Sequence, residues 1–232
     1  MGEEAMEEVT ISAIARLYGA FPQKFGIPRQ SNIVDNIVSR IVFEPEYRNV
    51  DALRGIDDFD YLWLVWRFSA NERQGWSPTV RPPRLGGNQR MGVFATRSSF
   101  RPNGLALSSV RLVRVERHTE NGPVLYVTGA DLMDGTPIYD IKPYLPYTDA
   151  HPDARSGFAP VAADCLLEVV CEPSLLGSVG EELREPLLDV LAHDPRPSYQ
   201  HDEEREYGLS FSGYNVKFKV RDDKVLYVVN IF

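Results

Sequence analysis

The stretch Tyr61–Phe68, "YLWLVWRF", decides the fold class of this chain, because every residue in it except Arg67 is apolar or aromatic. A short apolar run without alternation is typical of a strand that lies inside a sheet and is covered on both faces. Similar short apolar or period-two runs recur through the first two thirds of the chain, with almost no helical pattern between them. They are Val9–Ala15, Arg40–Phe43, Gly92–Thr96, Leu105–Val115, Val124–Thr128 and Pro137–Ile141. Clusters of Gly, Pro, Asn and Asp divide these runs, which favours an antiparallel barrel or a sandwich.

The character of the sequence changes after about residue 149, where the polar stretch "TDAHPDARSGFAP" is typical of a linker or long loop. We therefore predict two domains, residues 1–150 and residues 151–232. The second domain is expected to be small and of mixed α and β structure. Its first strand contains Cys165, Leu167, Val169 and Cys171 on one face, which indicates core packing.

A helix and a hairpin are expected after this strand. Leu183, Leu187 and Leu191 have helical spacing, and Ser178 with Glu181 could form a capping box. Pro186 favours a later start, at Glu185, because proline is tolerated in the first turn and not in the interior. The chain then ends in a predicted hairpin, in which Val216, Phe218 and Val220 precede a turn at Asp222–Lys224 and Val225, Tyr227, Val229 and Ile231 follow it.

Composition narrows the functional class. With 232 residues, 43% hydrophobic content and a net charge of −8, the chain is expected to be a soluble globular protein. No apolar run approaches the roughly 20 residues that cross a bilayer, and the first ten residues are acidic, so we expect a cytoplasmic protein. The four histidines and two cysteines have no spacing typical of a metal site, and we predict no metal.

An arginine-rich window interrupts this acidic background. Residues 73–115 contain eight arginines and no Asp, Glu or Lys. Guanidinium groups offer a rigid fork of donors and a flat face, which suits phosphate, carboxylate or a nucleobase. The alternative is a solvated arginine-rich surface without a ligand. Composition alone does not separate the two interpretations.

Four stretches combine turn residues with functional side chains: Gly26–Gln30, Arg81–Gly87, Ala95–Gly104 and Asp131–Tyr144. Each one alone is compatible with ordinary loop structure. The glycine-rich fingerprints of Rossmann and P-loop nucleotide binding and the serine hydrolase elbow are all absent from the sequence.

Taken together and in this order, the four stretches closely resemble the TrmO family, tRNA adenosine methyltransferases with a TsaA/YaeB-like β-barrel in place of a Rossmann sheet. The resemblance covers nearly the whole chain, from "PRQ" through "W.PTVRPPRLGGN.RMGVFATRS.FRPN" and "DL.DGTP..DIKPYLP" to "DPRP.Y". It implies a mainly β fold with an N-terminal antiparallel barrel. It also implies S-adenosylmethionine as the cofactor, N6 of the threonylcarbamoyl-adenosine at the anticodon of threonine tRNAs as the acceptor, and a homodimer.

The resemblance also implies which residues form the sites, although it names no catalytic residue. The implied cofactor contacts are Gln30, Ser31, Asn32, Phe68, Ser69, Arg97, Leu107, Asp131, Leu132, Met133 and Asp134. The implied tRNA contacts are Arg81, Arg84, Arg90, Arg101, Asp194, Arg196 and Tyr199. We expect Arg97 to bind a carboxylate through two parallel hydrogen bonds. Ser69-Ala70 replaces a His-Gln pair of close relatives, so a contact from that imidazole is missing or replaced.

Two other functions remain open at this point. The barrel could bind RNA or an adenine-containing ligand without chemistry, or the chain could be an enzyme acting on a small anionic metabolite held by Arg97 and Arg101. Transfer of a methyl label to tRNA distinguishes both from a tRNA methyltransferase.

Overall fold

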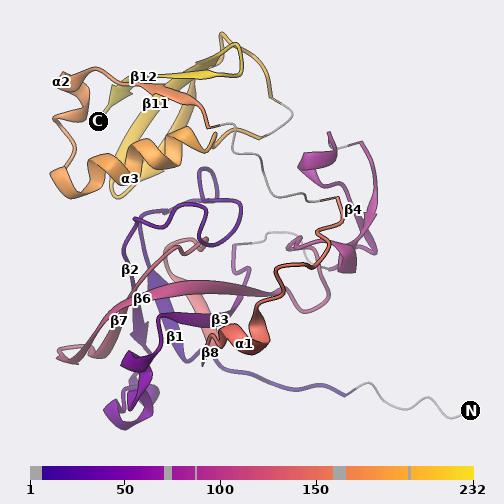
Figure 1. Cartoon of the computed structure of the whole chain (residues 1–232), viewed down its shortest axis with the longest axis vertical. Helices are drawn as coiled ribbons and strands as arrows, with labels where there is room; N and C mark the ends of the chain where they lie inside the picture. The colour runs from indigo at the N-terminus through magenta and orange to yellow at the C-terminus, as the bar shows by residue number, and fades with distance from the viewer. Residues whose placement is uncertain (1–6, 71–74, 87, 159–165, 198–199) are drawn as a thin grey trace, which may run out of the picture.

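The first two thirds of the chain form a closed antiparallel barrel. The computed structural model describes residues 7–70, 75–86, 88–158, 166–197 and 200–232. Six strands close the barrel in the order β1-β2-β7-β6-β3-β8, which confirms the predicted mainly β fold and leaves no free sheet edge (Figure 1). The strands are β1 (Ala15–Tyr18), β2 (Ser39–Phe43), β3 (Tyr61–Arg67), β6 (Leu105–Thr119), β7 (Gly122–Thr128) and β8 (Thr136–Pro143).

Strand β3 contains the stretch that predicted the fold, and it pairs with β6 on one side and β8 on the other. Leu62, Leu64 and Trp66 point into the barrel core, where they are at most 6% exposed. Trp63 and Val65 on the outer face are only partly covered. Strand β3 was expected to be covered on both faces. Its inner face is fully covered, and its outer face is covered in part.

Short elements connect the barrel strands. Three 3₁₀ turns lie between β2 and β3: η1 (Pro45–Tyr47), η2 (Val50–Leu53) and η3 (Ile56–Asp58). Between β3 and β6 lies a two-stranded ribbon of β4 (Thr79–Val80) and β5 (Met91–Gly92), with η4 (Pro83–Leu85) and η5 (Val93–Ala95). Helix α1 (Pro146–Asp149) follows β8.

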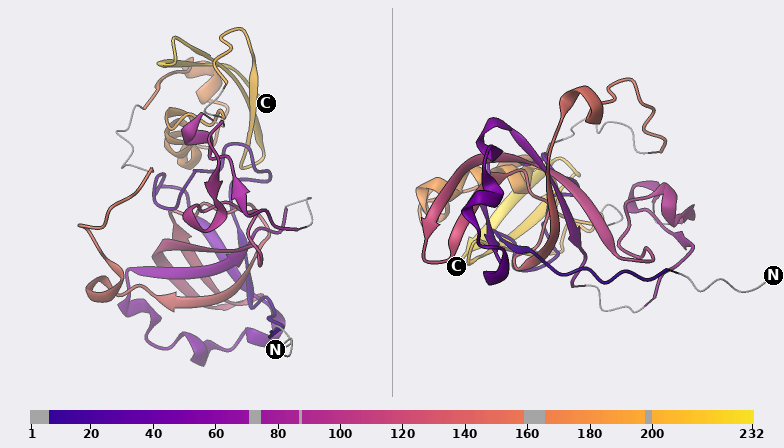
Figure 2. Two further views of the ribbon diagram at one scale, coloured as in Figure 1. Left: turned by 90° about the vertical axis from the view of Figure 1, so that its right-hand side faces the viewer. Right: turned by 90° about the horizontal axis from the view of Figure 1, so that it is seen from below.

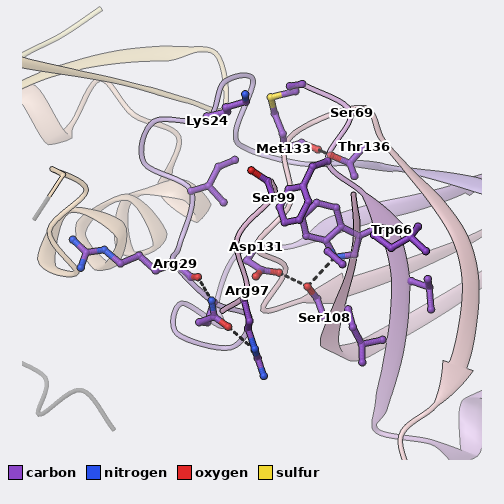
Figure 3. A pocket seen from close by; sticks show the side chains of 18 of the residues that line it. Lys24, Arg29, Trp66, Ser69, Arg97, Ser99, Ser108, Asp131, Met133 and Thr136 are labelled. Carbon is purple, nitrogen blue, oxygen red and sulfur yellow. Dashed lines mark hydrogen bonds between the residues drawn. The ribbon is translucent and has the colours of Figure 1, made fainter. Parts of the chain in front are cut away.

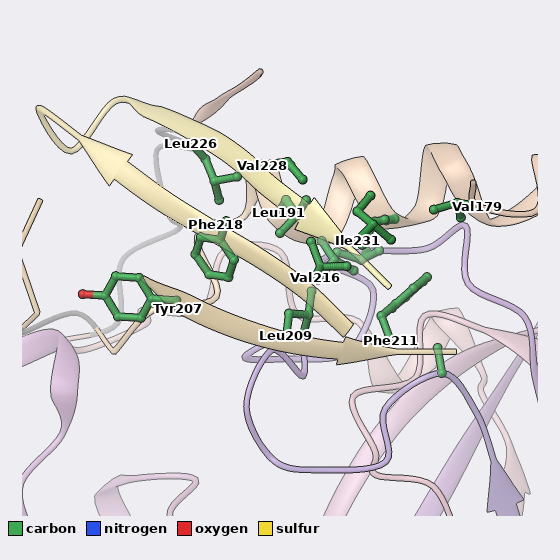
Figure 4. Close-up of a cluster of buried hydrophobic side chains, with 14 of the residues drawn as sticks. Val179, Leu191, Tyr207, Leu209, Phe211, Val216, Phe218, Leu226, Val228 and Ile231 are labelled. Atoms are coloured by element: carbon green, nitrogen blue, oxygen red, sulfur yellow. The ribbon is translucent and has the colours of Figure 1, made fainter. Parts of the chain in front are cut away.

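The C-terminal lobe packs one helix against a four-stranded sheet of order β10-β11-β12-β9. Its elements are β9 (Glu168–Val170), α2 (Pro173–Leu176), α3 (Glu181–Ala192), β10 (Tyr207–Phe211), β11 (Tyr214–Arg221) and β12 (Val225–Ile231). Figure 4 shows Leu191 of α3 against Phe211, Val216 and Phe218 of the sheet. These four side chains are fully buried.

Residues from the connection between β1 and β2 complete the core of this lobe. Ala20, Phe21, Val34 and Ile37 belong to the same buried cluster as the sheet and α3, and the ring of Phe21 meets that of Phe211 edge to face at 5.7 Å. The connection lies between the barrel and the C-terminal lobe in Figures 1 and 2. The core of the C-terminal lobe therefore includes residues that precede residue 150 in the sequence. The division of the chain into domains 1–150 and 151–232 stays a prediction.

Two predicted strands of the barrel half are wrong in extent. Residues 9–13 are outside any strand, with Val9 74% exposed, because backbone pairing with the neighbouring strands begins only at Ile14, which bonds to Ile138 and Glu44. In the stretch 92–96 only Gly92 is in a strand, since Val93–Ala95 form the turn η5. Thr96 closes that turn by donating its backbone N–H and its hydroxyl to the Val93 carbonyl.

Helix α3 begins earlier than predicted. Its first residue is Glu181 with Gly180 as the N-cap, and Pro186 lies inside the helix. Ser178 is no cap, since its hydroxyl donates to the Leu175 carbonyl. The buried ring of Pro186 packs in the core, and tertiary packing there outweighs the loss of one helical hydrogen bond. The predicted apolar face is confirmed for Leu187 and Leu191, which are fully buried.

The closing hairpin forms as predicted, but the residues of β12 that face the core differ from the expected set Val225, Tyr227, Val229 and Ile231. Leu226, Val228 and Ile231 are the buried residues of β12, while Tyr227 and Val229 are partly exposed. A register shift between Lys217 and Phe218 of β11 breaks the simple alternation expected for Val225–Ile231. In the first strand of the lobe, Leu167, Val169 and Cys171 share the covered face, and Cys165 lies outside the described residues.

Candidate functional site

A cavity of about 640 Å³ opens at the rim of the barrel, beside the strands β3 and β6. Its size lies within the usual range for small-molecule and cofactor sites. Four separate segments line it: the β1–β2 connection, the end of β3, the loop after η5 together with the start of β6, and the turn before β8 (Figure 3). The principal polar side chains are Arg29, Gln30, Arg97, Ser108, Asp131 and Thr136.

A chain of hydrogen bonds forms the floor of this cavity. The indole Nε1 of Trp66 donates to the Ser108 hydroxyl at 2.9 Å, and this hydroxyl donates to Oδ1 of Asp131 at 2.6 Å. Burial raises the pKa of the Asp131 carboxyl above its ordinary value, against the opposing effects of the Ser108 bond, the Arg97 charge and the Ser31 backbone N–H. The floor therefore presents a carboxylate in a partly desolvated setting.

A second hydrogen-bonded chain crosses the mouth of the cavity. Arg97 donates through Nη1 to the Oε1 atom of Gln30, and Nε2 of Gln30 donates to the carbonyl of Arg29. Arg29 in turn donates through Nη2 to the backbone carbonyl of Arg196 in the C-terminal lobe at 3.1 Å. Arg97 is exposed, and its hydrogen-bond partner is a neutral amide. Its charge thus remains available to an anionic ligand.

Most of the residues expected to bind a cofactor meet at this cavity. Those that line it are Gln30, Phe68, Ser69, Arg97, Leu107, Asp131 and Met133. Ser69 points toward Met133 in Figure 3, so the position that departs from the His-Gln pair still belongs to the cavity wall.

The other expected cofactor residues support the cavity without lining it. Asn32 has a left-handed backbone with φ of 61° and donates its side-chain amide to Ser109. Leu132 is 2% exposed and belongs to the barrel core. Asp134 accepts a hydrogen bond from the Gly19 backbone at 2.9 Å and so fixes the start of the β1–β2 connection. Ser31 acts through its backbone N–H on Asp131.

Sequence reasoning missed Ser108, Trp66 and Thr136 as parts of the site. All three are nearly buried and look like ordinary core positions in the sequence. The one signal in the sequence was the period-two position of Ser108 on the same strand face as Ala106, Val110 and Leu112, since a buried hydroxyl needs a partner.

The arginines expected to contact RNA have different settings. Arg81 and Arg90 are exposed on the β4–β5 ribbon, where Arg90 donates to the Thr79 hydroxyl at 2.9 Å. Arg101 donates to the carbonyls of Thr96 and Ser98, so part of its donor capacity shapes the loop itself. The backbone of Arg84 lies in η4, and its side chain is outside the described part of the structure.

Arg196 in the C-terminal lobe is almost completely buried, at 4% exposure. It donates to both carboxylate oxygens of Asp194 at 2.9 and 3.0 Å and to Asp223 at 3.0 Å. His201 also contacts Asp223 at 2.9 Å. The guanidinium plane of Arg196 is therefore covered, and stacking on a base would require this loop to open. Tyr199 lies outside the described residues.

The lining favours binding and orientation of a ligand over covalent catalysis. Neither Cys nor His occurs among the residues that line the cavity. In the described ranges of the chain, no group of three or more His, Cys, Asp or Glu side chains is arranged to hold a metal ion. The same ranges contain no helix of the length and apolar character needed to cross a bilayer. What the cavity offers is several cationic side chains (Lys24, Arg29, Arg97 and Arg101), the carboxylate of Asp131 and apolar walls.

Comparison with known proteins gives a consistent result over both lobes. The family model for the tRNA-methyltransferase O N-terminal domain matches residues 16–150, and the model for the TrmO C-terminal domain matches residues 171–232. The Escherichia coli tRNA (adenine(37)-N6)-methyltransferase is 39% identical over 229 residues, which cover 94% of this chain and 95% of the relative.

A relative from Pseudomonas aeruginosa is named as a candidate S-adenosylmethionine-dependent methyltransferase, RcsF. It is 39% identical over 207 residues, covering 86% of this chain and 87% of the relative. The crystal structure of TrmO from Pseudomonas aeruginosa superposes with a TM-score of 0.76 and 30% identity, and covers 97% of this chain and 100% of the solved one.

Proposed function

Because this chain belongs to the TrmO family and is an S-adenosylmethionine-dependent tRNA (adenine-N6)-methyltransferase, we propose that its acceptor is the threonylcarbamoyl-adenosine at position 37 of threonine tRNAs. The name of the Escherichia coli relative, tRNA (adenine(37)-N6)-methyltransferase, supports the position of the acceptor, and the convergence of Gln30, Arg97 and Asp131 on one cavity supports a cofactor site. These residues lie far apart in the sequence and reach the cavity from three different segments.

The residues of the cavity fit S-adenosylmethionine. Arg97 offers a guanidinium to the carboxylate of the cofactor, and Asp131 offers a carboxylate to an ammonium or to ribose hydroxyls. Phe68, Leu107 and Met133 supply apolar surface of the kind that covers an adenine ring. The volume of about 640 Å³ leaves room for part of the acceptor nucleoside as well.

The cofactor supplies an electrophilic methyl group on a sulfonium. Arg97 and Asp131 would hold the bound cofactor in the cavity, so that this methyl group is available to N6 of the acceptor. The protein positions the two reactants and excludes water, which accounts for most of the acceleration available to such a reaction. Asp194, expected as a tRNA contact, is bonded to Arg196 and does not line the cavity, so we assign it a structural role.

We further propose that residues 1–150 hold the cofactor and that residues 151–232 contact the tRNA. The exposed arginines of the β4–β5 ribbon, which belongs to residues 1–150, support an additional contact of this first domain with phosphates. The homodimer implied by the family resemblance is part of the same proposal, and sedimentation of the purified protein tests it directly.

The decisive experiment is transfer of labelled methyl groups to two tRNA pools, one normal and one from cells unable to add the threonylcarbamoyl group. Nucleosides are then separated by mass. We expect label only in the normal pool and only in the threonylcarbamoyl-adenosine. Label in both pools would show that the modification is not required, and no label in either would favour a non-catalytic binding barrel or a small-metabolite enzyme.

Arg97→Gln and Arg90→Gln form a matched pair for this assay. Both remove one charge from the same arginine-rich window, yet only Arg97 lines the cavity. We expect Arg97→Gln to lose S-adenosylmethionine binding and Arg90→Gln to keep it. Equal cofactor binding by the two variants would contradict the assigned role of Arg97.

A further inference from the structure

The segment between β3 and β6 forms a small module beside the barrel rim. We call residues 75–86 and 88–104 the arginine module. It consists of the β4–β5 ribbon with η4 and η5, and it stands to one side of the barrel in Figure 1. Its loop after η5 reaches the cavity, where Thr96 and Arg97 line the wall.

Two aromatic rings stack on each other at the surface of this module. The rings of Trp76 and Phe94 lie 6.4 Å apart between centroids with 24° between their planes. Trp76 is 53% exposed and Phe94 is 74% exposed, whereas the adjacent Val93 is 1% exposed. The module thus buries one apolar side chain and leaves the neighbouring aromatic pair in water, where its apolar area gives no folding stability.

Every charged residue of the arginine module is an arginine, since the module contains no Asp, Glu or Lys. Pairing of Thr79 with Gly92 and of Val80 with Met91 places Arg81 and Arg90 next to each other at one end of the ribbon. Trp76 and Phe94 flank the other end. Rings and cations therefore follow one another along the same ribbon.

We propose that the Trp76–Phe94 pair is a stacking site for an unpaired nucleobase of the RNA, next to the nucleotide that enters the cavity. This inference rests on the proposed function. Proteins that bind single-stranded RNA combine aromatic faces for the bases with cations for the backbone. In this arrangement Arg81 and Arg90 contact the phosphates that follow the stacked base.

Charge favours RNA over a second copy of the chain as the occupant of this face. An aromatic pair used for self-association would bring the same arginine module toward the partner, and the module offers no carboxylate to compensate its own cations. A phosphate backbone supplies the missing negative charge and releases counterions on binding.

The test compares Trp76→Ala/Phe94→Ala with Trp76→Phe/Phe94→Tyr, which retains two flat rings. Tyr147→Ala is the control, since Tyr147 is an aromatic residue with 87% exposure outside the module. For each protein we measure affinity for a threonine tRNA anticodon stem-loop and for an RNA duplex at one fixed salt concentration, affinity for S-adenosylmethionine, and sedimentation.

We expect the double alanine variant to bind the stem-loop about 5- to 100-fold more weakly, the range typical of one stacked base, with a smaller change for the duplex. The aromatic variant and Tyr147→Ala should bind like the wild type, and all variants should keep their cofactor affinity and sedimentation. Unchanged stem-loop affinity in the double alanine variant would overturn the inference, and so would its conversion to a smaller oligomer, which would make this face a subunit contact. Absence of methyl transfer by the wild type would instead count against the proposed function.

Discussion

Arg97 at the barrel rim and Arg196 in the C-terminal lobe carry the same guanidinium in opposite settings. Arg97 is exposed, and its hydrogen-bond partner is the neutral Gln30. Arg196 is buried against two carboxylates, those of Asp194 and Asp223. Both were expected to contact a ligand. The difference teaches that a buried arginine bonded to two carboxylates stabilises the fold, while an exposed arginine bonded to a neutral amide keeps hydrogen-bond donors for a ligand.

Arg196→Met gives the largest expected effect. The substitution leaves Asp194 and Asp223 without their buried partner, and we expect the free energy of unfolding in urea to fall by about 3 kcal/mol. This figure lies at the low end for buried pairs because the Asp223 side chain is 53% exposed. Arg221→Met is the control, since it removes only a cation–π contact with Tyr227 worth about 0.5–1 kcal/mol. If Arg196→Met left the free energy of unfolding unchanged and abolished tRNA binding, Arg196 would be a ligand contact and not a structural residue.

Arg97→Gln is expected to act on binding and hardly on stability. Loss of a charge-assisted contact should weaken S-adenosylmethionine binding by about 1.5–3 kcal/mol in calorimetry. The free energy of unfolding should change by less than about 0.5 kcal/mol because the side chain is exposed. A large fall in the free energy of unfolding of Arg97→Gln would show that Arg97, like Arg196, stabilises the fold.

Ser108→Ala tests the buried part of the rim. It removes the acceptor of the Trp66 indole and the donor to Asp131, so we expect the free energy of unfolding to fall by about 1–2 kcal/mol. Ser109→Ala is the neighbouring control, because Asn32 keeps a bond to the Ser109 carbonyl when the hydroxyl is lost. If both variants are equally stable, the Trp66–Ser108–Asp131 chain contributes nothing to the fold.

The smallest expected effect is a pair of opposite pH dependences. Burial raises the pKa of Asp131 in the folded state, so the folded protein binds more protons at this site than the unfolded protein does. The wild type should therefore lose stability relative to Asp131→Asn as the pH rises from about 3.8, the ordinary pKa of the group. Hydrogen bonds from His201 and Arg196 lower the pKa of Asp223. The wild type should therefore lose stability relative to Asp223→Asn as pH falls below about 3.8.

Urea unfolding of the wild type and the two variants between pH 3 and 7 measures both slopes. Slopes of the same sign would show that the two carboxylates do not differ in the way that their surroundings indicate.

The sequence predicted the parts of this fold that repeat a local pattern. Strand β3 follows from its continuous apolar run, and the helical face of Leu187 and Leu191 follows from their spacing. That Gln30, Arg97 and Asp131 belong to one site was implied by the resemblance to the TrmO family. Residues 9–13 and Pro186 escaped prediction because partner strands and core packing decide them. The burial of Arg196 also escaped, since nothing local shows that Asp223 folds back onto it.

The contribution of the β1–β2 connection to the C-terminal core has a consequence for synthesis on the ribosome. Phe21 and Val34 emerge early, yet the buried cluster that receives them includes Ile231 of strand β12, which is synthesised much later. Arg29 and Gln30, on the same connection, form a wall of the cavity. A nascent polypeptide therefore lacks a finished cavity wall until strand β12 has been synthesised and has packed on this connection.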